Sequence, residues 1–136
     1  ITGLKVDTST TNYMVVVDND GVLKKTNRNL ANAIEVVTGD YTATLEDETI
    51  IVNLGNDTST STPIVSTEVI TIKLPNADST NTGKRYVIKS TGENEKKSIK
   101  ISSNSIDGSA EAIESSLPFQ SWTLQSDGST WWVVGL

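Results

Sequence analysis

Cysteine and histidine are both absent from the sequence. Without cysteine there is no disulfide framework and no thiolate nucleophile. Without histidine the chain lacks the commonest general base and transition-metal ligand, and a Ser-His-Asp triad is excluded. A Ser-Lys pair needs no histidine, but no motif singles out a nucleophile. We therefore expect a protein that is not an enzyme and that has no catalytic residues, no bound metal and no cofactor.

Long apolar runs and excess positive charge are also missing. No stretch of about 18 apolar residues occurs, so we expect no membrane insertion. A net charge of -6 and a pI of about 4.5 argue against a nucleic-acid partner. The chain starts at Ile1 and shows no signal-peptide pattern, so we expect a fragment or a processed product.

Serine and threonine are abundant and together supply 35 of the 136 residues. Threonine suits strands, and both residues suit turns. No sustained helical period occurs, and the one candidate for a helical turn is Asn27 to Ile34. We expect an all-β fold, either a small antiparallel sandwich or a partly open barrel, preceded by an N-terminal β-hairpin.

The stretch from Glu68 to Lys89 carries the clearest strand pattern. Ile70, Ile72 and Leu74 alternate with polar residues, and Pro75 ends the strand because it cannot donate to a sheet ladder. A polar Asn/Asp/Ser/Thr/Gly connection follows, and a second alternating strand starts near Tyr86. The sequence therefore predicts two half-buried strands joined as a hairpin.

Both ends of the chain have strands that are apolar on two faces. Residues 13–17 are followed by Asp20-Gly21, a strong hairpin signal. Near the C-terminus, Trp131 and Val133 face one way, and Trp132 and Val134 face the other. Such faces need cover, and a two-stranded hairpin cannot cover itself. We expect residues 1–32 to be a hairpin connector that contacts other copies, and residues 33–136 to be the β-domain.

An ordered set of strand and turn motifs runs along the chain: Tyr41 to Val52, Ile70 to Pro75, Gly83 to Lys89, Ile99 to Ile101, Ile106 to Gly108 and Trp122 to Trp132. The order of these motifs resembles the β-structured domains of bacteriophage tail-fibre, head-fibre and receptor-binding proteins. The resemblance implies a virion surface fibre, a homotrimer, and contact with a glycan or protein receptor on a bacterial surface, and it implies no catalytic residues. The upstream hairpin from Val17 to Lys25 is similar to one seen in such fibres.

Two acidic segments are candidate sites. Asp18-Asn19-Asp20-Gly21 fits a calcium loop only in part, since position one falls on Val16 and position twelve on Asn27; a plain hairpin turn is preferred. Glu46-Asp47-Glu48, with nearby Asp40, could supply glycosidase carboxylates, but a solvated acidic turn is the preferred interpretation. A polysaccharide depolymerase is therefore permitted but not indicated.

Aromatic and basic side chains give the candidate recognition surface. Aromatic rings stack on sugars and are favoured at recognition surfaces. A basic cluster, comprising Lys84, Arg85, Lys89, Lys96, Lys97 and Lys100, is either an anion-binding patch or, preferably, solvent-facing charge that protects a strand edge. A carbohydrate-binding module or bacterial adhesin domain is the alternative function. The candidate recognition residues are Tyr41, Tyr86, Trp131, Lys84 and Arg85.

Overall fold

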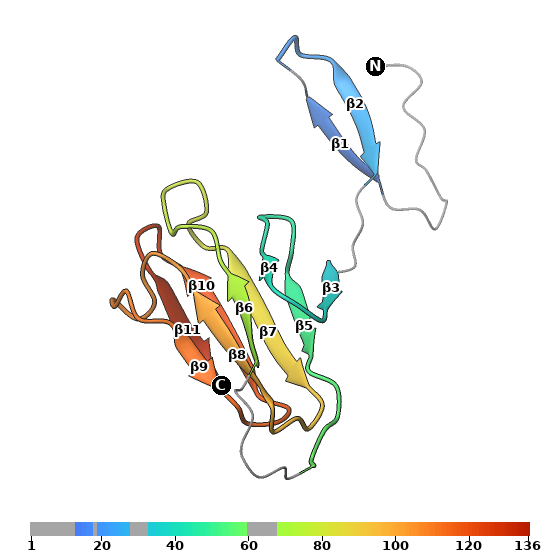
Figure 1. Ribbon diagram of the computed structural model, residues 1–136. Helices are drawn as coiled ribbons and strands as arrows, with labels where there is room; N and C mark the ends of the chain where they lie inside the picture. The colour runs from blue at the N-terminus through green and yellow to red at the C-terminus, as the bar shows by residue number, and fades with distance from the viewer. Residues whose placement is uncertain (1–12, 18, 28–32, 60–67) are drawn as a thin grey trace. The chain divides into compact units, whose positions relative to one another are not determined.

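The computed structural model describes residues 13–17, 19–27, 33–59 and 68–136 (Figure 1). Its contacts divide the chain into two compact units, Ile1–Asn32 and Ala33–Leu136. The described residues form eleven strands and no helix, which confirms the all-β prediction. Most of the helical turn expected at Asn27 to Ile34 lies outside the described residues, and its two ends, Asn27 and Ile34, are strand residues.

The first unit contains an antiparallel hairpin of β1 (Tyr13–Val17) and β2 (Leu23–Asn27). Gly21 adopts a φ of +78° in the connecting turn, a conformation that glycine accepts at little steric cost. The Asp-Gly hairpin signal is therefore confirmed. Val17 and Leu23, paired in register at the turn end, are both more than half exposed.

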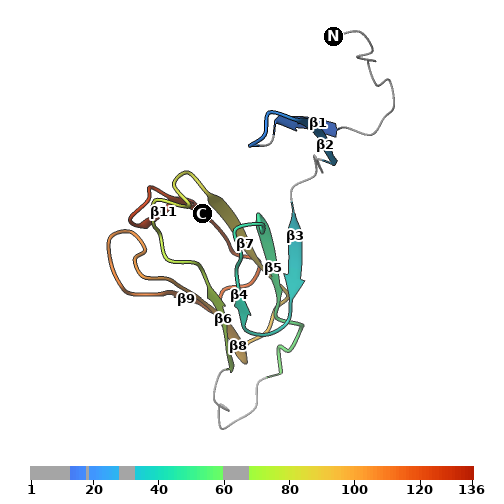
Figure 2. The ribbon, with the colours of Figure 1, turned by 90° about the horizontal axis from the view of Figure 1, so that it is seen from above.

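The second unit consists of two sheets that lie as two layers, as Figures 1 and 2 show. The five-stranded sheet has the order β11-β10-β7-β5-β3, and the four-stranded sheet has the order β4-β6-β8-β9. Their strands are β3 (Ile34–Val37), β4 (Tyr41–Thr42), β5 (Thr49–Asn53), β6 (Glu68–Lys73), β7 (Arg85–Thr91), β8 (Lys97–Ser102), β9 (Ile113–Ser115), β10 (Ser121–Ser126) and β11 (Trp131–Gly135).

From β3 to β8 the chain passes from one sheet to the other after every strand. Consecutive strand pairs therefore form three coils stacked side by side, and like strands of neighbouring coils pair in parallel: β3 with β5 and β5 with β7, and β4 with β6 and β6 with β8. The corners stack as well, since the amide of Leu54 donates to the carbonyl of Thr91. Strands β9, β10 and β11 then continue both sheets in antiparallel pairing.

This winding corrects two expectations. The strands at Glu68–Lys73 and Arg85–Thr91 belong to different sheets, so the predicted central hairpin is wrong. The expected sandwich is confirmed and neither sheet closes into a barrel, but both sheets are mixed and not antiparallel as expected. The physical reason is that parallel neighbours need a crossover, and here the crossover is a strand of the opposite sheet.

The core lies between the two sheets and follows the predicted alternation. Tyr86 and Trp131 are fully buried, their ring centroids are 5.2 Å apart, and the indole nitrogen of Trp131 donates to the carbonyl of Pro75 at 2.8 Å. Aliphatic side chains fill most of the remaining space. They include Ile50, Val52, Leu54, Ile70, Ile72, Leu74, Ile88, Ile99, Ile101 and Leu124.

The two edge strands of the five-stranded sheet, β11 and β3, differ in their surroundings. At β11, the 105–109 turn docks on the strand: the Trp131 amide donates to the carbonyl of Ser105, and the Asp107 amide donates to the carbonyl of Trp131. Ile106 in this turn is buried, with 4% of its surface exposed. At the other edge, β3 carries Ile34 and Val36, which are 63% and 60% exposed.

Candidate functional site

Two of the predicted recognition residues lie in the core. Tyr86 and Trp131 have no exposed surface, so neither ring is available to stack on a ligand in this structure. Both stand on the inward face of their strands, where an aromatic ring gains more from burial than from solvent contact. The alternation along β11 places Trp132 outward instead, with 44% of its surface exposed.

Tyr41 is half-buried and forms part of a hydrogen-bonded turn. Its hydroxyl donates to the Asp47 carboxylate at 2.9 Å, and the same oxygen accepts the Thr44 amide at 2.8 Å. Burial, together with the hydrogen bond to Asp47, raises the pKa of Tyr41 to about 12. Asp47 is 9% exposed, so its carboxylate stabilises the acidic turn through these hydrogen bonds and is not solvated.

Lys84 and Arg85 hold local contacts at the start of β7. The Lys84 ammonium lies 4.9 Å from the centroid of the Tyr86 ring, a cation–π distance. The Arg85 guanidinium donates to the side-chain oxygen of Gln125 at 3.2 Å on the neighbouring strand. The five predicted residues therefore do not form one surface: two are buried, and the other three make separate contacts.

The remaining lysines of the predicted basic cluster are divided between the two sheets. Lys89 lies on β7 and donates to the carbonyl of Phe119, whereas Lys97 and Lys100 lie on β8. The three lysines on β8 and just before it each have an acidic partner: Lys96 with Asp57 at 2.9 Å, Lys97 with Glu68 at 3.6 Å, and Lys100 with Glu114 at 3.4 Å. These contacts agree with solvent-facing charge, but the expected protection of a strand edge is wrong, because β7 and β8 both lie inside their sheets.

The outer surface of the five-stranded sheet is apolar near β3. Ile34 and Val36 lie opposite Thr49 and Ile51 in the parallel register, and on β5 Thr49 and Ile51 alternate with core residues Ile50 and Val52. Val87 continues the surface because it pairs with Thr49 on the next strand. We call Ile34, Val36, Ile51 and Val87 the aliphatic face. Contiguous exposed apolar surface of this kind marks a contact site more often than isolated apolar residues do.

A second exposed apolar feature is the β9–β10 loop, residues 116–120. Leu117 and Phe119 are 61% and 53% exposed, and Phe119 has a φ of +53°, an uncommon value for a bulky residue. The loop is fixed at its far end, since the Gln120 amide donates to the Ser90 hydroxyl at 3.0 Å and the Ser90 amide donates to the Gln120 carbonyl at 2.8 Å. This loop was not among the predicted site residues, and Leu117-Pro118-Phe119 in a polar stretch is its only sequence signal.

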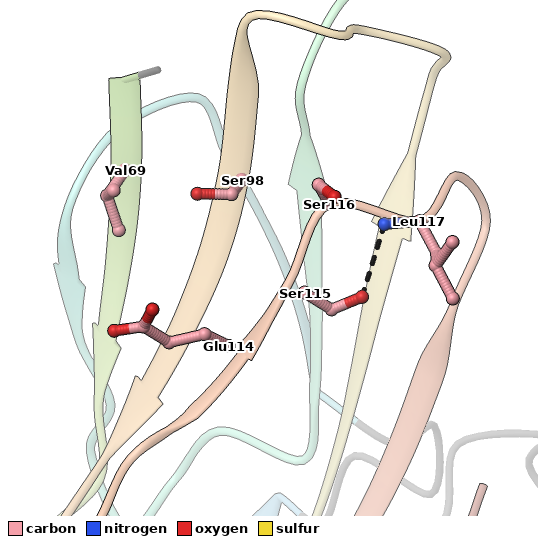
Figure 3. A pocket seen from close by; sticks show the side chains of 6 residues that line it. All are labelled: Val69, Ser98, Glu114, Ser115, Ser116 and Leu117. Atoms are coloured by element: carbon pink, nitrogen blue, oxygen red, sulfur yellow. Dashed lines mark hydrogen bonds between the residues drawn. The ribbon is translucent and has the colours of Figure 1, made fainter. Parts of the chain in front are cut away.

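An open depression of about 600 Å³ lies on the outer face of the four-stranded sheet, beside this loop. In Figure 3 the Ser98 hydroxyl and the Glu114 carboxylate point toward β6, the strand that carries Val69. Leu117 stands at the opposite end, where its amide donates to the Ser115 hydroxyl at 3.1 Å. The lining residues are Val69, Ser98, Glu114, Ser115, Ser116 and Leu117, and we call this site the serine depression.

A smaller depression of about 140 Å³ adjoins the serine depression through Ser116. It is lined by Thr58, Glu93, Asn94, Glu95, Ser116 and Pro118. Two coil corners meet beside this depression and are joined by hydrogen bonds. The Asp57 main-chain amide donates to the Glu93 carbonyl at 2.8 Å, and the Asn94 side-chain amide donates to the Leu54 carbonyl at 2.8 Å. We call it the corner depression.

Within the described ranges, no three acidic side chains gather into a group that could hold a metal ion, and Asp18 of the calcium-loop candidate lies outside those ranges. Of the predicted glycosidase candidates, Asp40 accepts the Thr71 amide at 2.8 Å, and Asp47 is engaged by Tyr41 and Thr44. Both carboxylates therefore have structural contacts. The described part of the chain also contains no helix with the length and hydropathy to cross a membrane.

Comparison of the chain with protein-family models, with curated proteins and with solved structures finds no match in any of the three.

Proposed function

We propose that the chain is a structural and host-attachment module of a bacteriophage virion fibre, that it acts without catalysis, and that it assembles as a homotrimer. The observation that supports assembly best is the aliphatic face, on which Ile34 and Val36 are both more than half exposed. Covering this face with further copies would remove apolar surface from water, which is the main driving force of association. The ordered β-motifs of the sequence motivate the choice of a fibre.

Sedimentation velocity of the full chain over a concentration series tests the assembly. We expect a species of three times the 14.6 kDa chain mass. Val36→Lys should dissociate it, because an ammonium group on the aliphatic face cannot be buried without a partner. Leu45→Lys is the matched control, since Leu45 is 48% exposed on the β4–β5 turn and is not part of that face. A monomeric wild-type chain at every concentration would reject the trimer.

Binding to bacteria tests the attachment half of the proposal. The labelled full chain should bind cells of some strains in a bacterial panel and should leave their surface polysaccharide uncut. Release of new reducing ends during incubation would instead indicate a depolymerase.

A carbohydrate-binding module or bacterial adhesin domain is the second candidate. The exposed Leu117 beside two depressions lined by hydroxyl, amide and carboxylate groups favours it. The two candidates differ in assembly: a monomer that binds glycans and cells would favour the second one over the fibre module.

A further inference from the structure

We propose that the serine depression and the corner depression together bind a neutral oligosaccharide of at least two sugar units. The proposal rests on the attachment function proposed above and names the class of ligand for it. The two depressions share Ser116 and flank one loop, so a linear ligand could occupy both. Their volumes of about 600 and 140 Å³ fit a ligand of this size better than a single ion or a folded protein surface.

The lining chemistry favours a sugar. Ser98 and Ser116 supply hydroxyl groups that both donate and accept hydrogen bonds. Val69 and Leu117, which are 43% and 61% exposed, offer apolar contact to the C–H face of a ring. A sugar presents the same combination, with hydroxyl groups at its rim and C–H groups on its faces.

The charges of the site select against acidic ligands. Glu93, Glu95 and Glu114 line the two depressions. Lys100 lies beside Glu114 and is already paired with it at 3.4 Å. The whole chain carries a net charge of -6. An anionic polysaccharide would be repelled by this field, so the ligand class is neutral.

The loop between the depressions is organised before any ligand binds. Hydrogen bonds fix both of its ends, from the Leu117 amide to Ser115 and from the Gln120 amide to Ser90. A fixed loop loses little conformational freedom on binding, which favours affinity. The depression is open, so affinity at one site should be weak, and several copies on one fibre would raise it by multivalency.

The site lies on the outer face of the four-stranded sheet, whereas the aliphatic face lies on the outer surface of the five-stranded sheet. Ser98 alternates with core residue Ile99 on β8, and Val36 lies opposite Ile51 on the other sheet. Assembly in which the aliphatic faces of the copies meet one another would leave the serine depression open to a ligand.

Protein-observed NMR titration of the full chain tests this inference. The probes are maltotetraose, cellotetraose and mannotetraose as neutral ligands, and tetragalacturonate as the acidic comparison. We expect at least one neutral probe to shift amide signals of residues 93–95, 98 and 114–117. Leu117→Ala should weaken that binding by about fivefold, because it removes aliphatic carbons that a ligand in an open depression covers only in part. Glu114→Gln should weaken it by about tenfold through the loss of a charged acceptor.

Leu45→Ala is the matched control, because it shortens an exposed leucine on a different loop and should leave binding unchanged. Circular dichroism and thermal melting of each variant verify folding. No response to any neutral probe, signal changes elsewhere on the domain, or equal binding of tetragalacturonate would each overturn the inference. Cell binding without a response to neutral sugars would overturn it and leave the attachment function standing. Sugar binding by a chain that binds no cells would overturn the attachment function and leave the sugar-binding inference standing.

Discussion

The phenol hydroxyl of Tyr86 donates a 2.6 Å hydrogen bond to the main-chain carbonyl of Thr44, a residue 42 positions earlier in the chain. Tyr86 has no exposed surface, so this bond ties the β4–β5 turn to the core of the third coil. Tyr86→Phe keeps the ring and leaves the Thr44 carbonyl without this donor. We expect a loss of about 1–3 kcal/mol in the free energy of unfolding, measured by urea denaturation. An unchanged unfolding midpoint would show that water replaces the hydroxyl at no cost.

Alkaline pH should destabilise the fold through the two tyrosines near Asp47. The pKa values of Tyr41 and Tyr86 are raised from 10.0 to about 12, chiefly by burial and then by interactions with Asp47. Between pH 10 and 12 the unfolded chain loses these protons and the folded chain keeps them, so stability is complete below pH 10 and falls as the pH rises toward 12.

Spectroscopic titration of tyrosinate checks this prediction. Tyr41→Phe and Tyr86→Phe should each remove a component that titrates near pH 12, and each variant should lose less stability than the wild type over that range. Titration of all tyrosines near pH 10 in the folded chain would contradict it.

The sequence was sufficient to predict most of the strands and, along those with clear alternation, which residues face inward. Ile70 and Ile72 alternate with polar residues and are buried, and Trp131 and Trp132 face opposite ways as expected. Strand pairing could not be predicted in the same way. An alternating strand has one apolar face in a hairpin and in a coil alike, so the pattern cannot decide whether the next strand pairs with it or crosses to the opposite sheet.

The candidate site was harder to predict than the fold. Tyr86 has the residue type of a recognition surface, but its place on the inward face of β7 makes it a core residue. The serine depression is built mainly from residues of β6, β8 and β9 that have no local motif, and β9 itself has only three residues. Only the pairing of β8 with β6 and β9 brings Ser98, Val69 and Glu114 together.

Acid should weaken the corner between β5 and β6 through Asp57. Hydrogen bonds from Ser59 and then from Lys96 lower the pKa of Asp57 from 3.8 to about 2. The carboxylate therefore contributes stability that is complete above about pH 4 and is lost as the pH falls toward 2. Asp57→Asn should lower the melting temperature at about pH 6, and the difference from the wild type should shrink as the pH approaches 2.

Glu46→Gln is the matched control for that series, because it removes one carboxylate from an exposed turn position. It should leave the melting temperature close to the wild-type value at the same near-neutral pH. If Asp57→Asn and Glu46→Gln gave the same curve, the contacts of Asp57 would have no measurable effect on stability.

Gly92 is required where two coil corners approach each other. It has a φ of +89°, and a Cβ placed on it would lie 2.3 Å from the carbonyl oxygen of Gly55, a main-chain atom that cannot rotate away. Gly92→Ala should therefore cost about 1–3 kcal/mol in unfolding free energy from the left-handed conformation alone, with the steric clash adding to it.

Gly39→Ala is the control, since a Cβ added at Gly39 would meet no atom within 4 Å and its φ is not positive. Urea denaturation should show Gly39→Ala at or slightly above wild-type stability, because alanine restricts the unfolded chain. Equal unfolding midpoints for the two variants would contradict the close stacking of the second and third coils at this corner.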